Sequence, residues 1–214
     1  MSYLNIEATK AMTYDAIVVG SGVSGGWASK ELTEKGLKVL MLERGRALEH
    51  VSGYENAMKD PWQTNYNGRL TIEQKKSHPF LSRDYPYNEM TETYWMNDSD
   101  SLYEEKRRFD WFRPNIVGGK SIMWGRQSYR WSDLDFEANL KEGIAVDWPI
   151  RYKDIAPWYS YVEKHVGISG EKLGLPQLPD SEFLPPMDMY CVEKEVLKRI
   201  EKNFPGRTMT IGRV

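Results

Sequence analysis

Short apolar runs alternate with glycine-rich and polar positions over the first 45 residues. Residues 16–19 are consecutively apolar, and residues 37–42 form a second, mostly apolar run. Runs of this length, bounded by turn residues, predict buried strands. Between them, residues 27–35 have apolar positions on one helical face, and Gly36 follows where a left-handed helix end is expected. The pattern therefore predicts a strand–helix–strand unit over residues 14–45.

The pattern changes after this unit. Residues 46–95 are polar and rich in turn dipeptides, which predicts an irregular insertion without a packed layer, acting as a lid or a binding loop. Residues 150–166 predict a helix with Asp154 as its N-cap, Pro157 in its first turn and Gly167 after its end.

The last part of the chain contains one more predicted helix. Residues 170–186 are rich in proline and glycine and are typical of a linker, and residues 191–203 predict an amphipathic helix. Residues 211–214 are strand-like with nothing to close them, so we expect the chain to be truncated.

The first turn carries the most specific chemistry. Gly20-x-Gly22-x-x-Gly25 directly follows the first predicted strand, and Glu43 ends the second. The three glycines permit a tight turn, a close approach of the backbone to a pyrophosphate, and close packing of the helix, whose N-terminus favours anions. A carboxylate at Glu43 suits the hydroxyls of an adenosine ribose. The sequence predicts a dinucleotide site; the alternative is a strand–helix–strand unit that binds nothing.

A second glycine-rich segment follows at residues 113–125. Gly118 and Gly119, followed by Lys120 and Ser121, are expected to expose consecutive backbone N–H groups that cradle an anionic or electron-rich group. The alternative is an ordinary Gly-Gly turn between two aromatic-rich segments.

Composition narrows the function classes. The net charge of −2 gives no basic field for nucleic acid, and the single cysteine, Cys191, excludes an internal disulfide framework. Neither a secretory signal nor a membrane-spanning run is present, so we expect a cytoplasmic chain, with export alongside a partner left open. His50, His78 and His165 are not spaced as metal ligands, so no metal site is predicted.

Six of the eight tryptophans lie within residues 95–158. Large aromatic side chains are more often core than ligand platforms, so we expect most of the six to be buried. Trp124 is the exception, because it adjoins the second glycine-rich segment. The six are Trp95, Trp111, Trp124, Trp131, Trp148 and Trp158.

Together these motifs resemble the glucose–methanol–choline family of flavoprotein oxidoreductases. The resemblance runs from about residue 13 to 167 and rests on Gly20-Ser-Gly-Val-Ser-Gly25, Leu42-Glu-Arg-Gly45, Val117-Gly-Gly-Lys-Ser-Ile-Met-Trp-Gly125 and Asp147-Trp-Pro-Ile-Arg-Tyr-Lys-Asp-Ile-Ala-Pro-Trp-Tyr159. The Gly-Gly segment is closer to the pyranose oxidase branch and bacterial sugar dehydrogenases than to glucose oxidase, whose usual asparagine is replaced by Trp124.

The resemblance implies an FAD-dependent oxidoreductase that oxidises an alcohol or sugar hydroxyl by hydride transfer to flavin N5. It implies that the cofactor-binding residues are Gly20, Ser21, Gly22, Val23, Ser24, Gly25, Glu43, Arg44, Gly118, Gly119, Ser121 and Trp124. The family's catalytic histidine, with its partner histidine or asparagine, lies in a C-terminal region that this chain does not include, so no catalytic residue is expected here. Met123 matches the histidine that can tether flavin in the pyranose oxidase branch, so we expect non-covalent FAD.

The expected fold class is α/β. It comprises a lead-in (1–13), a Rossmann-like FAD-binding domain (14–150) that contains the insertion, and the truncated start of an α+β substrate-binding domain (151–214). Expected partners are a small alcohol or sugar, an electron acceptor of unknown kind, and the C-terminal half of the same protein. Two other functions remain open: a nicotinamide-dependent dehydrogenase, and a non-catalytic nucleotide-fold subunit completed by another chain.

Overall fold

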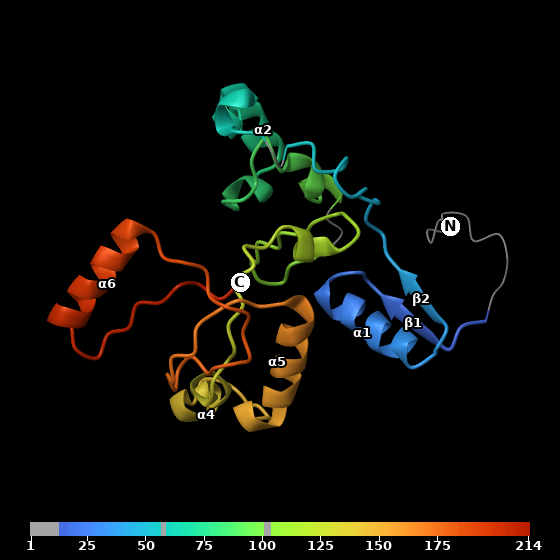
Figure 1. Cartoon of the computed structure of the whole chain (residues 1–214). Coiled ribbons are helices and arrows are strands. Elements are labelled where there is room, and N and C mark those ends of the chain that lie inside the picture. The colour runs from blue at the N-terminus through green and yellow to red at the C-terminus, as the bar shows by residue number, and fades with distance from the viewer. Residues whose placement is uncertain (1–12, 57–58, 101–103) are drawn as a thin grey trace. The chain divides into compact units, whose positions relative to one another are not determined.

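The computed structural model describes residues 13–56, 59–100 and 104–214. The chain divides into two compact units, residues 1–124 and residues 125–214 (Figure 1). The predicted domain boundary at residue 150 falls inside the second unit, where the N–H of Ser128 donates to the carbonyl of Arg213 at 2.8 Å. The assignment of residues 14–150 to one functional domain stays a prediction.

The first unit begins with the expected strand–helix–strand motif. β1 (Ala16–Val19) and β2 (Val39–Leu42) pair in parallel, with Ala16 opposite Val39 and Val19 opposite Leu42. The strand predicted at residues 16–19 is confirmed. The connecting α1 (Val23–Glu34) contacts both strands (Figure 1). The described residues therefore show a small parallel sheet with helices, and the full Rossmann-like sheet stays a prediction.

α1 begins four residues before the predicted start at Trp27. Gly22 is its N-cap, in an extended conformation, and the N–H of Gly26 already donates to the carbonyl of Gly22 at 2.8 Å. The adjacent Gly25 and Gly26 have low helix propensity, which concealed this first turn in the sequence. Gly36 has a φ of 83°, as expected for a left-handed residue after the helix.

The sheet leaves apolar side chains in contact with solvent. Ile17 and Val19 of β1 are 63% and 81% exposed, and Leu42 of β2 is 47% exposed. Among the described residues the sheet has two strands, so each strand has one edge without a ladder partner.

The insertion at residues 46–95 is built mainly of single turns. It contains α2 (Ile72–Ser77), whose N-cap Thr71 accepts from the N–H of Gln74. The short 3₁₀ turns of the segment and its flank are η1 (Pro61–Gln63), η2 (Asn65–Gly68), η3 (Leu81–Arg83), η4 (Glu92–Tyr94) and η5 (Asp98–Asp100).

The insertion contains a small buried cluster within its irregular turns, and its role as a lid or a binding loop stays a prediction. Leu81, Tyr87 and Trp95 form a buried cluster, and Phe112 and Met123 pack against it. Widely spaced apolar residues in an otherwise polar segment gave no periodic signal, because the turns that bring them together are irregular.

The second unit contains α3 (Asp133–Phe136), α4 (Ala138–Glu142), α5 (Tyr152–Val166) and α6 (Cys191–Asn203). The prediction for α6 is confirmed at both ends. The prediction for α5 needs two corrections. Arg151 is the N-cap, with Asp154 accepting its N–H at 2.8 Å from the third helical position, and Pro157 lies inside the helix beyond the first turn.

A buried ion pair organises this unit. Arg130 and Glu163 are 5% and 7% exposed, and the guanidinium Nη2 lies 2.6 Å from the Glu163 carboxylate. Arg130 also donates to Tyr152, Ser160 and Ser181, at 2.8, 2.9 and 2.6 Å. The guanidinium therefore joins α5 to segments on either side of it in the sequence.

The expectation of buried tryptophans is wrong for most of them. Trp95 is buried, whereas the other five are 43–67% exposed. Trp131 and Trp148 show the reason. Their rings meet edge to face with centroids 6.1 Å apart, and each ring contacts the buried Phe136. One part of each ring is therefore packed, while the rest faces solvent.

Candidate functional site

The glycine turn after β1 has the geometry that its three glycines predict. Gly20 has a φ of 93°, and its N–H donates to the carbonyl of Leu42 at 2.7 Å. A Cβ on Gly25 would lie 1.9 Å from the carbonyl oxygen of Gly20, so only glycine fits there. A Cβ on Gly22 would meet no atom of the described residues within 4 Å, which leaves open space beside the backbone at the N-cap of α1.

The N-terminus of α1 is suited to an anion. Gly22 provides no side-chain cap, and the first turn contains no acidic residue. The first N–H groups of a helix lack intrahelical acceptors and lie at the positive end of its dipole. Val23 and Ser24, both predicted cofactor residues, lie in this first turn and are exposed.

Glu43 holds the turn from the end of β2. Its Oε2 accepts from the Ser21 N–H at 2.8 Å and from the Ser21 hydroxyl at 2.6 Å, and its Oε1 accepts from the Gly45 N–H at 2.7 Å. Partial burial favours the neutral acid, but the hydrogen bonds from Ser21 and the backbone outweigh it and hold the pKa of Glu43 below its ordinary value of 4.5. The carboxylate is exposed; the two Ser21 donors use both lone pairs of Oε2, and Oε1 keeps one lone pair beside the Gly45 hydrogen bond.

Ser21 joins the turn to the second glycine-rich segment. Its hydroxyl accepts a hydrogen bond from the Gly118 N–H at 2.8 Å while it donates to Glu43. A Cβ on Gly119 would lie 3.7 Å from the Cα of Gly22, so the two loops are in contact. The structure thus brings together the two groups of predicted cofactor residues, which are about a hundred positions apart in the sequence.

Gly45 is a residue whose structural role the sequence analysis missed. A Cβ there would lie 2.6 Å from the backbone nitrogen of Ile116. The close approach allows a parallel bridge between Arg46 and Ile116, in which the Val117 N–H donates to the Arg46 carbonyl at 2.9 Å. Gly45 appeared in the sequence only as part of a family motif, and no local signal paired it with Ile116.

The Gly118–Ser121 turn is more closed than expected. Gly118 and Gly119 have φ values of 92° and 55° and lead into η6 (Gly119–Ile122). The N–H of Gly119 donates to the Ile116 carbonyl at 3.0 Å, and the Ser121 N–H and hydroxyl both donate to the Gly118 carbonyl. The expected row of consecutive free N–H donors is therefore corrected, because the 3₁₀ turn uses several of these groups internally.

The residues around this turn face different surroundings. Trp124 is 46% exposed, whereas Met123 packs against the buried Leu81 cluster. Arg44 donates to the sulfur of Met96 at 2.5 Å. A cavity of about 280 Å³ adjoins the turn; Ile122 and Met123 line it together with Tyr54, Asn56, Pro86, Met90, Thr91 and Tyr94.

The three histidines have separate surroundings. The rings of His50 and His78 meet those of Tyr54 and Tyr87 edge to face, and His165 lies in the last turn of α5. Across residues 13–56, 59–100 and 104–214, no cluster of three or more His, Cys, Asp or Glu side chains is arranged to hold a metal ion.

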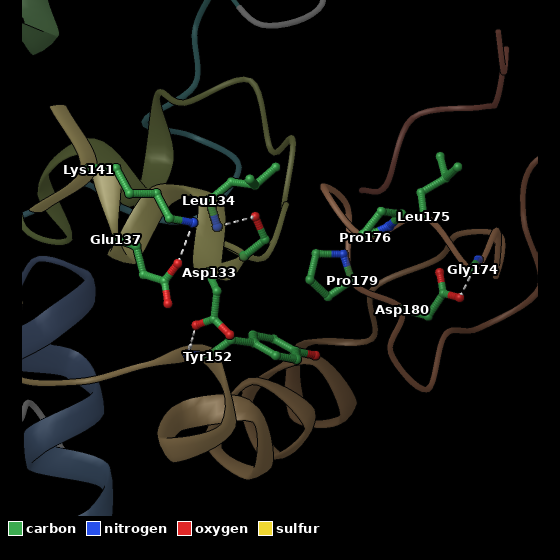
Figure 2. Close-up of a pocket in the computed structure, with 11 residues that line it drawn as sticks. Asp133, Leu134, Glu137, Lys141, Tyr152, Gly174, Leu175, Pro176, Pro179 and Asp180 are labelled. Carbon is green, nitrogen blue, oxygen red and sulfur yellow. Dashed lines mark hydrogen bonds and ion pairs between the residues drawn. The ribbon is translucent and has the colours of Figure 1, made fainter. Parts of the chain in front are cut away.

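The second unit has a separate open groove of about 580 Å³ (Figure 2). Its carboxylates already have partners: Asp133 accepts from the Tyr152 N–H at 2.7 Å, Glu137 pairs with Lys141, and Asp180 pairs with Arg213. Apolar side chains fill the rest of the wall: Leu134, Leu175, Pro176 and Pro179. Nothing in this groove selects a particular ligand.

No protein-family model matches the chain. It is similar to several characterised proteins. It is 28% identical to the 2-methyl-1,2-propanediol dehydrogenase of Mycolicibacterium austroafricanum, over 80% of this chain and 27% of that protein. It is 23% identical to the fructose dehydrogenase large subunit of Gluconobacter japonicus, over 76% of this chain and 29% of that protein. It is 28% identical to the oxygen-dependent choline dehydrogenase of Xanthomonas axonopodis pv. citri, over 70% of this chain and 23% of that protein.

The chain therefore spans about a quarter of the length of the curated relatives it matches. By their names these relatives are oxidoreductases that act on alcohols or sugars, and the low identity supports a relationship at the family level only. Among the helices in the described part of the chain, none has both the length and the apolar character needed to cross a bilayer.

Proposed function

We propose that this chain provides the FAD-binding part of an oxidoreductase of the glucose–methanol–choline type, which oxidises the hydroxyl-bearing carbon of an alcohol or a sugar. The observation that carries the proposal is the contact between the two glycine-rich segments, tied together by Ser21 and Glu43. The relatives named above support the class of reaction.

The residues present fit the phosphate and ribose groups of FAD. The open side of Gly22 would admit a pyrophosphate, and the uncapped N–H groups at the start of α1 would bind its oxygens. Gly20, Ser24 and Gly25 complete this surface. Glu43 would accept a hydrogen bond from a ribose hydroxyl at Oε1, where Gly45 uses only one of the two lone pairs.

We assign the second segment to the flavin end of the cofactor. Gly118, Gly119 and Ser121 would lie along the flavin ring, with Trp124 beside them. At the other end of the cofactor, Arg44 would lie toward the adenine. The ammonium group of the exposed Lys120 would add a positive charge near this turn. FAD, when bound, supplies the atom that accepts the hydride from the substrate carbon.

Oxidation of an alcohol also requires a base for the hydroxyl proton. His50, His78 and His165 lie in different parts of the chain, and we assign none of them this role. The family resemblance places the base, a histidine, in a C-terminal region outside these 214 residues. On this proposal the chain binds and orients the cofactor, and the rest of the protein completes the substrate site.

We further propose that the flavin is held without a covalent bond, and that the chain is closer to the pyranose oxidase branch and bacterial sugar dehydrogenases than to glucose oxidase. Met123 stands where a histidine can tether the flavin in that branch. A thioether offers no ordinary route to such a bond, and Met123 already packs against the Leu81 cluster.

The test is to purify the protein, record its visible spectrum and precipitate it with acid. We expect a yellow supernatant in which chromatography identifies FAD. Recovery of a nicotinamide nucleotide would favour the dehydrogenase alternative, and colour retained in the pellet would show a covalent tether. With the full-length protein, which would include the base, anaerobic addition of diols, glucose or choline should then bleach the flavin band, whereas methyl ethers that lack the reacting hydroxyl should not.

A further inference from the structure

Ser21 has an arrangement that a cofactor contact does not explain. Its hydroxyl oxygen lies 2.6 Å from Glu43 Oε2 and 2.8 Å from the Gly118 nitrogen, and its own N–H donates to the same Glu43 oxygen at 2.8 Å. Ser21 therefore connects the ends of three segments: the turn after β1, the end of β2, and the start of η6.

The donors of Ser21 are already in use. A serine hydroxyl has one proton and two lone pairs, and here the proton goes to Glu43 while one lone pair accepts from Gly118. Phosphate oxygens at neutral pH accept hydrogen bonds, so a phosphate contact would need a donor that Ser21 does not have free. The hydrogen bonds of Ser21 therefore indicate a role other than donation to a phosphate, and a direct contact of Ser21 with the cofactor stays a prediction.

The hydrogen bonds from Gly118 to Ser21 and from Ser21 to Glu43 strengthen each other. The ionised Glu43 carboxylate polarises the Ser21 O–H, and a polarised hydroxyl is a better acceptor for the next N–H. Gly118 is the left-handed residue that precedes η6, so its N–H fixes where that turn begins. Without the hydroxyl, the Gly118 N–H would lose this acceptor and the turn would lose its link to the end of β2.

We propose that Ser21 is a positioning residue that sets the Gly118–Ser121 turn against the N-terminus of α1, and thereby aligns the flavin end of the site with its nucleotide end. The inference rests on the proposed function, since it concerns how the same cofactor site is assembled. It assigns Ser21 no contact with substrate or cofactor.

The test compares FAD with ADP, which contains the nucleotide end alone. In Ser21→Ala we expect the dissociation constant of FAD to rise about tenfold or more, with a changed visible spectrum of the bound flavin, while that of ADP changes little. Ser21→Thr keeps a hydroxyl and should restore both FAD binding and the spectrum. Ser21→Cys, a weak donor and acceptor of similar shape, replaces the alanine variant if the latter does not fold.

Ser29→Ala is the matched control. Ser29 lies in α1, and its buried hydroxyl has no hydrogen-bond partner among the described residues, so the same substitution there removes none of the hydrogen bonds that the structure shows. Equal losses of FAD and ADP affinity in Ser21→Ala would show a direct contact with the nucleotide and overturn the proposal, as would unchanged FAD binding. Failure of the unsubstituted protein to bind FAD would instead contradict the proposed function.

Discussion

A Cβ on Gly25 would lie 1.9 Å from the carbonyl oxygen of Gly20. The two residues are therefore in backbone contact, and this contact holds the start of α1 against the end of β1. Because the neighbouring atom belongs to the backbone, it cannot move aside as the end of a flexible side chain could.

Gly25→Ala should accordingly destabilise the first unit, by about 1–3 kcal/mol or more. Gly26→Ala is the matched control: a Cβ there meets nothing within 4 Å, so it should stabilise α1 by about 0.5–1 kcal/mol. Urea unfolding followed by circular dichroism would measure both. Similar stabilities of the two variants would contradict the close contact.

Gly22→Ala should separate binding from folding. The Gly22 backbone has a φ of −63°, which alanine adopts, and its Cβ position is open, so we expect stability to change by less than about 1 kcal/mol. The added methyl group would occupy the space for the pyrophosphate and weaken FAD binding about tenfold or more. FAD titration and thermal unfolding of the same preparation give both quantities; undiminished FAD affinity would remove Gly22 from the site.

Glu43→Ala should weaken FAD retention by about tenfold or more, because hydrogen bonds to a charged group are among the stronger ones in proteins. The variant also removes the acceptor for Ser21 and Gly45. Glu49→Ala, an exposed glutamate close in sequence, controls for the loss of charge. Equal FAD affinities of the two variants would rule out the assignment of Glu43.

The lowered pKa of Glu43 predicts a pH dependence. A carboxylate whose pKa is lower in the folded than in the unfolded chain contributes its full stability above the ordinary value of 4.5, and loses it as the pH falls through the folded-state pKa. Glu43→Gln should therefore be less stable than the unsubstituted protein at pH 7, and the two should converge below pH 4.5. Thermal unfolding across this pH range would measure the difference in stability between the two proteins. A difference that grows as the pH falls would contradict a lowered pKa of Glu43.

Glu163→Ala should destabilise the second unit strongly. It would leave the buried Arg130 guanidinium without its counter-ion, a change that costs about 3–5 kcal/mol in other buried pairs. Glu182, whose pair with Lys164 is exposed, is the control, and Glu182→Ala should have little effect. Urea unfolding of both variants, followed by circular dichroism, would measure the loss, since α5 and α6 of this unit are the two longest helices in the described part of the chain. Comparable losses of stability in both variants would show that the buried Arg130–Glu163 pair contributes no more than an exposed ion pair.

Local patterns allowed the prediction of elements whose determinants lie close together in sequence. Residues 16–19 formed the expected strand, and α6 has the expected bounds because amphipathic periodicity is a local signal. The start of α1 was missed because Gly25 and Gly26 are poor helix formers, and only the fold of the turn places them in a helix.

Long-range contacts could not be predicted in this way. Nothing near Ser21 indicates that its hydroxyl accepts from Gly118, and nothing near Gly45 indicates that the Ile116 backbone approaches it. The buried pair of Arg130 and Glu163 likewise joins residues that look like ordinary surface charges in the sequence. The sequence therefore predicted which residues could form the site, and the structure shows how some of them support one another.

The edge of β1 and its solvent-facing side chains should promote self-association of the chain in solution. Ile17 and Val19 present β-branched side chains next to an edge that no other described strand pairs with, and such an edge is a template for adding a foreign strand. Concentrated samples of residues 1–214 alone should therefore form soluble clusters and later precipitate. Dilute handling should keep the sample monodisperse.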